Sequence, residues 1–165
     1  MATTTINYGS WADVTITLAS LATSATLLAG REATVIDNTS TKAVDYLVGG
    51  HIATGTSPTD LKSIRIYAFA DITSTTEYGE PTGADAALTF NDEESRDSNL
   101  RLLHVISTDD TSDQLYQWGP FSIADIYGSV PQKIGFWVTH DTGVNLNSTG
   151  TNHQISYIPI KYDSA

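Results

Sequence analysis

Strict alternation of apolar and polar residues in short segments is the sequence feature that most constrains the fold. Residues 64–69 read Ile-Arg-Ile-Tyr-Ala-Phe, and Val14, Ile16 and Leu18 are separated from one another by threonines. Successive side chains of a β-strand point to opposite faces, so a period of two predicts strands that bury one face. The pattern therefore favours a domain built from β-sheets.

Further strand candidates follow at the spacing that a β-sandwich requires, which gives eight to ten strands in all. They are residues 26–36, 43–54, 87–90, 100–107, 114–118, 133–139 and 154–162. Gly30 and the pair Gly49-Gly50 interrupt the first two and predict a bulge or bend, or two short strands in place of the first. A helix over residues 19–29 is the competing interpretation there, because its apolar residues also fit helical spacing.

Two short helices are predicted between the strands. Ser122 and Asp125 stand at the spacing of a helix-capping pair, and Gly128 is placed to end that helix. Residues 91–94 can open another short helix. The stretch 71–99 holds eight acidic residues and only one basic residue, Arg96, and we predict an exposed, elaborated loop with a small strand at its centre.

Composition agrees with one all-β domain. The chain has 165 residues, of which 40% are hydrophobic and only 16% charged, whereas a helical domain uses more Lys and Glu. We predict an antiparallel β-sandwich with one or two short helices. A jelly roll is the leading architecture and an open barrel the alternative. Residues 1–10 are expected to form a polar N-terminal arm, and residues 11–165 the single sandwich domain. The arm is rich in Thr and free of charge, which suits addition of a strand to a neighbour's sheet edge, and a disordered tail is the alternative.

Charge and cysteine content exclude several classes of function. Eight Lys and Arg against nineteen Asp and Glu leave a net charge of −11, which repels phosphate backbones and disfavours nucleic-acid binding. The absence of cysteine excludes disulfides and thiolate metal sites. No apolar stretch approaches a membrane span, and the N-terminus lacks the features of a signal peptide, so no membrane association is expected.

The chain offers no pattern typical of catalysis. A nucleophilic triad needs a histidine, and none of the four, His51, His104, His140 and His153, accompanies a Gly-x-Ser-x-Gly elbow. His-x-His and His-x-x-x-His zinc spacings and glycine-rich phosphate loops are also absent. We expect four structural histidines, no enzymatic activity, no catalytic residue and no cofactor.

Two acidic clusters are the candidates for a calcium site, since calcium prefers carboxylate and carbonyl oxygens. They are Asp92, Glu93, Glu94 and Asp97, followed by Asp109, Asp110 and Asp113. Neither cluster has EF-hand spacing, and solvated acidic loops explain both. We predict no metal site, with weak ion binding as the alternative.

Aromatic residues in or beside strands allow two interpretations, a sugar-binding platform or the filling of a sandwich core, and the core is favoured. They are Trp11, Tyr67, Tyr116, Trp118, Trp137 and Tyr157. In addition, residues 64–69 and 102–106 carry apolar side chains on both faces. A second apolar face has to be covered by a loop of the same chain or by a neighbouring subunit, and the low charge content favours association through β surfaces.

Three further stretches and two turns are considered together. They are Leu27-Leu28-Ala29-Gly30-Arg31-Glu32-Ala33-Thr34, Gly55-Thr56-Ser57-Pro58 leading into Ile64-Arg65-Ile66-Tyr67, and Gly119-Pro120-Phe121-Ser122 through Gly135-Phe136-Trp137-Val138-Thr139, with the turns Asn38-Thr39-Ser40 and Asp141-Thr142-Gly143. Over about residues 14–162 the chain thereby resembles a group of small virion structural proteins of tailed bacteriophages.

The resemblance implies a jelly-roll protein that decorates the capsid, often as an oligomer at a symmetry axis. The expected function is that of a capsid decoration or cement protein, which binds the outer capsid surface and stabilises the head by bridging major-capsid subunits. The expected partners are the major capsid protein and further copies of this chain, and the expected location is the virion, after assembly in the host cytoplasm. The alternative is a tail-associated module that binds carbohydrate or a receptor.

Overall fold

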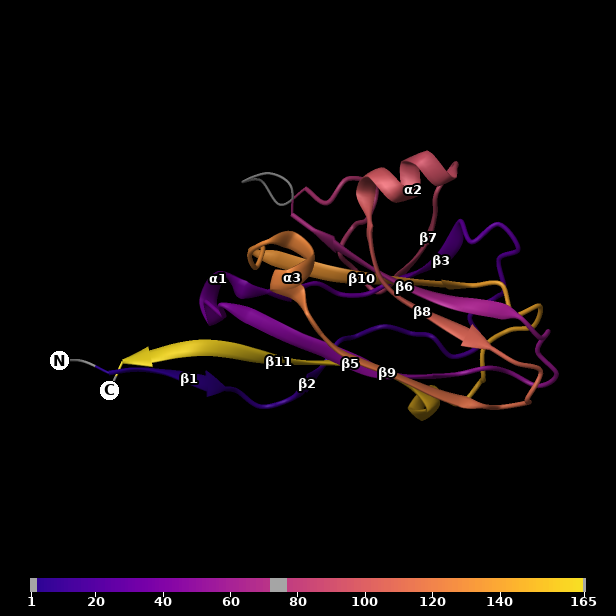
Figure 1. Cartoon of the computed structure of the whole chain (residues 1–165). Coiled ribbons are helices and arrows are strands. Elements are labelled where there is room, and N and C mark those ends of the chain that lie inside the picture. The colour runs from indigo at the N-terminus through magenta and orange to yellow at the C-terminus, as the bar shows by residue number, and fades with distance from the viewer. Residues whose placement is uncertain (1–2, 72–76, 165) are drawn as a thin grey trace.

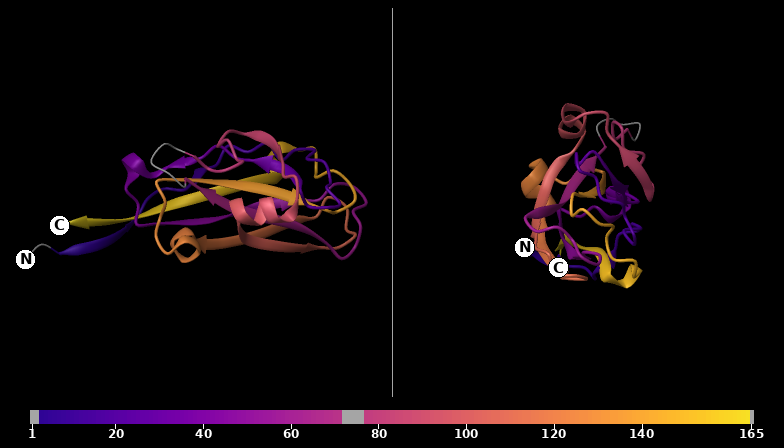
Figure 2. Two further views of the ribbon diagram at one scale, coloured as in Figure 1. Left: turned by 90° about the horizontal axis from the view of Figure 1, so that it is seen from above. Right: turned by 90° about the vertical axis from the view of Figure 1, so that its right-hand side faces the viewer.

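Two antiparallel sheets packed face to face form the fold in a computed structural model, which describes residues 3–71 and 77–164 (Figure 1). This confirms the predicted antiparallel β-sandwich. The end-on view in Figure 2 shows the two layers, and the view from above shows the N- and C-terminal strands extending beyond the body of the sandwich.

The five-stranded sheet has the order β1-β11-β5-β9, with β2 also paired to β11. Its strands are β1 (Thr4–Tyr8), β2 (Ala12–Asp13), β5 (Asp45–Ala53), β9 (Leu115–Ser122) and β11 (His153–Ser164). The register of β5 against β9 shifts between Val48 and Gly50, so the bulge predicted at the double glycine is confirmed.

The six-stranded sheet has the order β7-β3-β10-β6-β8, and β4 also pairs with β10. Its strands are β3 (Ala29–Glu32), β4 (Ile36–Asp37), β6 (Lys62–Ala70), β7 (Ala86–Thr89), β8 (Arg101–Thr108) and β10 (Lys133–His140). The run 26–36 thus contains two short strands, the second of which continues to Asp37. These pairings establish a sandwich but not the jelly-roll connectivity, which stays a prediction.

Three short α-helices and one 3-10 turn connect the strands of the described chain, where one or two helices were expected. They are α1 (Asn38–Thr41), α2 (Glu93–Asn99), α3 (Ile123–Tyr127) and η1 (Gly150–Asn152). The predicted capping is confirmed at α3, where the Ser122 hydroxyl accepts from the Asp125 amide and Gly128 ends the helix. The Asp92 carboxylate caps α2 in the same way. The described helices include none that is long and apolar enough to cross a membrane.

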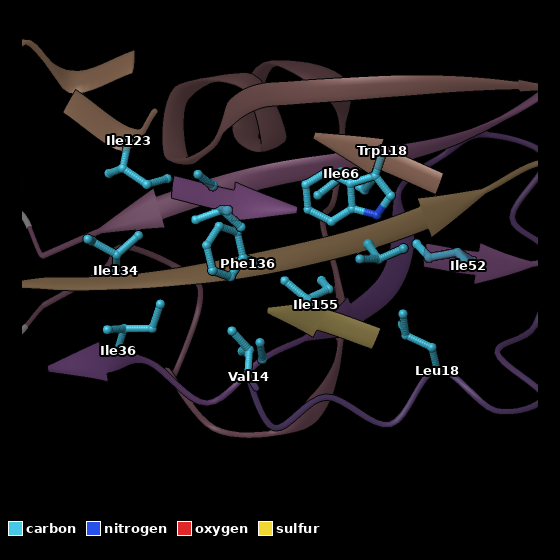
Figure 3. Close-up of a cluster of buried hydrophobic side chains, with 14 of the residues drawn as sticks. Val14, Leu18, Ile36, Ile52, Ile66, Trp118, Ile123, Ile134, Phe136 and Ile155 are labelled. Carbon is cyan, nitrogen blue, oxygen red and sulfur yellow. The ribbon is translucent and has the colours of Figure 1, made fainter. Parts of the chain in front are cut away.

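The core lies between the sheets, where the inward side chains of both meet (Figure 3). Ile64 and Ile66 on β6 and Phe136 on β10 are fully buried, and they face Val48 and Ile155 of the other sheet. The alternation in the sequence thus marks the buried face of each of these strands.

A second, smaller core covers part of the outer face of the six-stranded sheet. Residues 77–100, named here the cover segment, contain β7, which pairs with β3 at the edge of this sheet, and α2 (Figure 1). Side chains of this segment pack on β6 and β10, whereas Leu102 and Val105 of β8 stay exposed. The buried residues of this second core are Tyr67, Phe69, Tyr78, Phe90, Leu100 and Trp137. The small central strand was predicted correctly. The expected exposure was wrong for this part, because Tyr78, Phe90 and Arg96 are buried; residues 72–76 of the predicted loop lie outside the described residues.

One local prediction in the first third of the chain is wrong, and one alternative interpretation is excluded. Residues 14–18 keep their alternating burial but form no strand, because the segment crosses between the sheets. The Val14 amide donates to Ile155 in one sheet, whereas the Thr15 carbonyl accepts from Thr34 beside the other. The alternative helix over 19–29 is also absent, since Ser20 and Leu27 adopt left-handed backbone angles.

Candidate binding surface

The outer face of the five-stranded sheet carries an apolar stripe that continues onto the terminal strands. Tyr8 pairs with Ile160, and Ile6 pairs with Tyr162. Directly opposed residues of an antiparallel pair point to the same face, so these four side chains share one face. We name the whole set the open stripe: Ile6, Tyr8, Trp11, Leu47, Ile158, Ile160 and Tyr162.

The register places this stripe on the outside of the sandwich. Ile155 is buried in the core, and side chains alternate along a strand, so Ile158 and Ile160 point away from that core. Leu47 pairs with Ile158 and stands between the core residues Tyr46 and Val48, so it also points outward.

The stripe is open to solvent at its terminal end and at Trp11, whereas Ile158 is buried and Leu47 and Ile160 are half-buried. The exposed fractions of Ile6, Tyr8, Trp11 and Tyr162 are 60%, 59%, 55% and 61%. The two terminal strands that carry most of it, residues 4–8 and 160–164, are named here the terminal arm, and in Figure 1 the arm projects from the sandwich with both chain ends at its tip. Large apolar side chains that are contiguous and exposed are typical of an interaction surface.

The opposite face of the arm is polar. It carries Thr5, Asn7, Lys161 and Asp163, and the Asn7 amide donates to the Asp163 carboxylate at 2.5 Å. The arm is therefore amphipathic, with the charged groups of β11 on the side away from the open stripe.

Trp11 also forms one wall of a shallow groove of about 370 Å³ on the same outer face. Gly49 and Gly119 lie along the groove at the β5–β9 bulge, and Gln117 and Ser156 supply polar groups. Beside the groove, the Asp13 carboxylate accepts from Gln154 and Ser156 at 2.7 and 2.8 Å. An exposed indole next to amide and hydroxyl groups can stack on a flat ligand and hydrogen-bond its edge.

The other aromatic residues that the sequence suggested for a platform do not join Trp11. Tyr67, Trp118 and Trp137 are buried, and Tyr116 and Tyr157 are partly buried against the main core. The structure therefore offers one exposed tryptophan where a platform of six was considered.

Each of the four histidines has a structural contact. His140 is fully buried, with Nε2 3.0 Å from the Leu21 carbonyl and Nδ1 3.0 Å from the Thr142 hydroxyl. His153 contacts the Asn147 carbonyl, His51 contacts the Thr151 carbonyl, and the ring of His104 lies 5.0 Å from that of Phe121. Burial lowers the pKa of His104, His140 and His153, so all three favour the neutral form.

Acidic residues of the two candidate calcium clusters also serve the local structure. Asp92 caps α2, and Asp113 accepts from the Asn147 amide at 2.7 Å. Asp109 accepts from the Thr111 amide and the Tyr116 hydroxyl, and these hydrogen bonds lower the pKa of its carboxyl. Among the described residues, no three His, Cys, Asp or Glu gather closely enough to hold a metal ion.

Sequence reasoning missed most of the open stripe. Trp11 was named, and residues 1–10 were expected to form an arm, of which residues 1 and 2 lie outside the described residues. The pairing of that arm with the chain's own C-terminal strand joins residues about 150 positions apart along the chain, which no local pattern encodes. One local signal was available: Tyr162 lies in a predicted strand as a large aromatic residue near the C-terminus, and it pairs with Ile6, the neighbour of Tyr8 on the same face.

Comparisons of this chain with family models, curated proteins and solved structures gave no match.

Proposed function

We propose that the protein is a structural component of a bacteriophage virion, a decoration or cement protein that acts by binding. It attaches to the outer capsid surface and bridges neighbouring major-capsid subunits. The observation that carries this proposal is the open stripe, an apolar surface with an exposed terminal end, on a sandwich whose other outer face is covered over β3, β6 and β10 by its own chain. The location on the phage head is proposed from the sequence resemblance.

The mechanism follows from mass action. A protein that binds the expanded capsid better than its dissociated subunits stabilises the assembled state. The stripe supplies aromatic and branched aliphatic side chains of the kind that dominate binding energy at protein interfaces. The acidic remainder of the surface, with a net charge of −11, suits a position outside the DNA-filled shell.

Cosedimentation with expanded, undecorated capsids of the cognate phage tests this proposal. We expect saturable binding at a fixed copy number per capsomer, and at least a tenfold loss of affinity for Tyr162→Ser, since about 1.4 kcal/mol corresponds to that factor. Leu61→Ser is the matched control, because Leu61 is 89% exposed but lies in the turn before β6 and not on the open stripe. Absence of binding, or equal losses for both variants, would overturn the proposal.

A carbohydrate- or receptor-binding tail module is the second candidate, favoured by the groove at Trp11. The groove combines an exposed indole with Gln117 and Ser156, a set suited to stacking on a sugar ring and bonding its hydroxyls. A glycan array with Trp11→Ala beside the wild type tests it. Binding to a defined glycan that the variant loses supports this function, and no binding to any glycan rejects it.

A further inference from the structure

The outer edge of β1 is an unpaired strand edge. β1 is the terminal strand of its sheet, and no described segment lies against its other side. Natural proteins protect such edges with lysine, proline or a bulge, because a free edge pairs with other chains. β1 reads Thr-Thr-Ile-Asn-Tyr and contains none of these devices.

The hydrogen-bond pattern shows which residues of β1 face the free edge. The Gly9 amide donates to the Pro159 carbonyl, so Gly9 faces β11. The residues along an antiparallel strand alternate in direction, so Asn7 and Thr5 also face β11. Tyr8, Ile6 and Thr4 therefore direct their N–H and C=O groups outward. The Ile160 carbonyl supports this assignment. Ile160 is paired with Tyr8, but its carbonyl accepts from the Val44 amide on the other side of β11, so the two residues do not bond to each other through this carbonyl.

This pattern is self-complementary. If a second β1 is placed antiparallel with Ile6 opposite Ile6, then Thr4 lies opposite Tyr8 at both ends, and all three outward residues of each strand meet outward residues of the other. Each of these pairs exchanges two hydrogen bonds, which gives about six across the junction. We propose that a second copy of this chain binds here, through a two-fold β1–β1 pairing centred on Ile6.

Charge and shape favour a second copy as the partner. The chain carries −11 overall, so two copies repel each other unless they meet at an uncharged element. β1 has no charged residue, and the antiparallel arrangement places the partner's sandwich beyond the tip of this copy's arm (Figure 1). The pairing also joins two two-stranded arms into one four-stranded sheet, and a two-stranded ribbon alone is only marginally stable.

The junction would unite the open stripes of both copies on one face. Opposed residues share a face, so Ile6 of each copy adjoins the other, with Tyr8 and Tyr162 flanking them. The inference therefore deepens the proposed function, since it makes the capsid-binding unit a dimer with a doubled apolar surface. It does not depend on that function, because the dimer forms in solution without a capsid.

Sedimentation equilibrium of the purified chain is the first test. We expect twice the chain mass of 17.7 kDa for the wild type. Ile6→Pro removes an outward N–H that β11 does not use, so we expect a folded monomer, whereas Ile6→Val keeps the dimer. A monomeric wild type, or a dimer unaffected by Ile6→Pro, would overturn the inference.

Cysteine crosslinking tests the register, in a chain that has no cysteine of its own. We expect Ile6→Cys to form a disulfide-linked dimer, since hydrogen-bonded partners have Cα atoms about 5.5 Å apart. Thr5→Cys and Asn7→Cys should each stay uncrosslinked alone and crosslink only when mixed, because Thr5 opposes Asn7 of the other copy. Crosslinking of Thr5→Cys with itself, or none for Ile6→Cys, would contradict this register.

Loss of the dimer and loss of capsid binding are separate results. A dimer that fails to cosediment with capsids retains this inference and rejects the proposed function. A monomer that binds capsids through the open stripe retains the proposed function and rejects this inference.

Discussion

The two sheets of the sandwich both carry apolar side chains on their outer faces. The chain covers the outer face of the six-stranded sheet over β3, β6 and β10, and it leaves Leu102 and Val105 of β8 exposed. On the six-stranded sheet, Trp137 is fully buried beneath Phe90 of the cover segment, with ring centroids 5.3 Å apart. On the five-stranded sheet, Tyr8 and Tyr162 remain more than half exposed. The same kind of residue therefore stabilises the monomer on one side and is available for binding on the other.

Polar contacts explain why the cover stays in place. Glu32 is buried on β3, and its carboxylate accepts from the Thr82 amide, the Thr82 hydroxyl and the Gly83 amide. Arg31 adds an ion pair with Asp85 at 2.6 Å. No described segment is held over the terminal end of the open stripe, where Ile6, Tyr8 and Tyr162 are each more than half exposed.

Substitutions in the cover are expected to have the largest effect on stability. Phe90→Ala removes a buried ring that packs on Trp137, and we expect a loss of about 3–5 kcal/mol in the free energy of unfolding, measured by denaturant titration. Leu61→Ala, at an exposed position, should change it by less than about 0.5 kcal/mol. A small effect of Phe90→Ala would mean that the cover does not form a core.

Substitution of the buried Glu32 should have an intermediate effect on the free energy of unfolding. Glu32→Gln keeps the shape but removes the charge and replaces one of the two acceptor oxygens with an amide nitrogen, so we expect a loss of about 1–3 kcal/mol in the same titration. Exchange of the Thr82 and Gly83 amides with solvent should accelerate as well. Unchanged exchange at these two amides would contradict the role of Glu32.

A smaller change in the free energy of unfolding is expected from pH. It should arise from buried histidines, chiefly His140. The folded-state pKa of His140 lies below its unfolded value because burial disfavours the charged form. The unfolded chain therefore binds the proton more readily, so stability is full above about pH 6.5 and decreases as the pH falls through that value. Unfolding titrations between about pH 5 and 8 measure this.

His140→Gln should reduce this pH dependence and leave the part that His104 and His153 contribute, while Tyr162→Ser should leave it unchanged. The carboxyls of Asp37, Asp85 and Asp109 have lowered pKa values, so they add their loss of stability only below about pH 4. A pH profile that is flat in the wild type between about 5 and 8 would contradict the account of the buried histidines.

The smallest effect on stability should come from the open stripe. Tyr162→Ser alters a side chain that is 61% exposed, so we expect a change within about 0.5 kcal/mol in the unfolding free energy. The affinity of this variant for capsids should nevertheless decrease. A loss of stability as large as that of Phe90→Ala would show that the stripe belongs to the monomer core.

Much of the fold could be predicted from the sequence because its signals are local. The alternation of β6, the capping residues Ser122 and Asp125, and the Gly49-Gly50 bulge depend on neighbouring residues only. The contacts that separate the two outer faces are long-range. Nothing in the sequence near Tyr67 or Trp137 indicates that Arg96 lies over the ring of Tyr67 and that Phe90 packs on the ring of Trp137, although Arg96 is the single basic residue in an acidic stretch.

The Val14–Leu18 segment illustrates the limit most clearly. Its alternation correctly predicts which side chains are buried, and Val14 and Leu18 belong to the core. A strand also needs a continuous ladder with one neighbour, and this segment bonds first to one sheet and then to the other. Burial pattern and strand pairing are separate properties, and only the first is encoded locally.

Hydrogen–deuterium exchange of the dilute protein, free and bound to expanded capsids, tests the contrast between the two faces most directly. We expect slower exchange on binding over residues 4–13, 45–51 and 156–163, and no change over residues 77–100. Protection of residues 77–100 without protection of the terminal arm would contradict this contrast, because the covered face would then be the binding face.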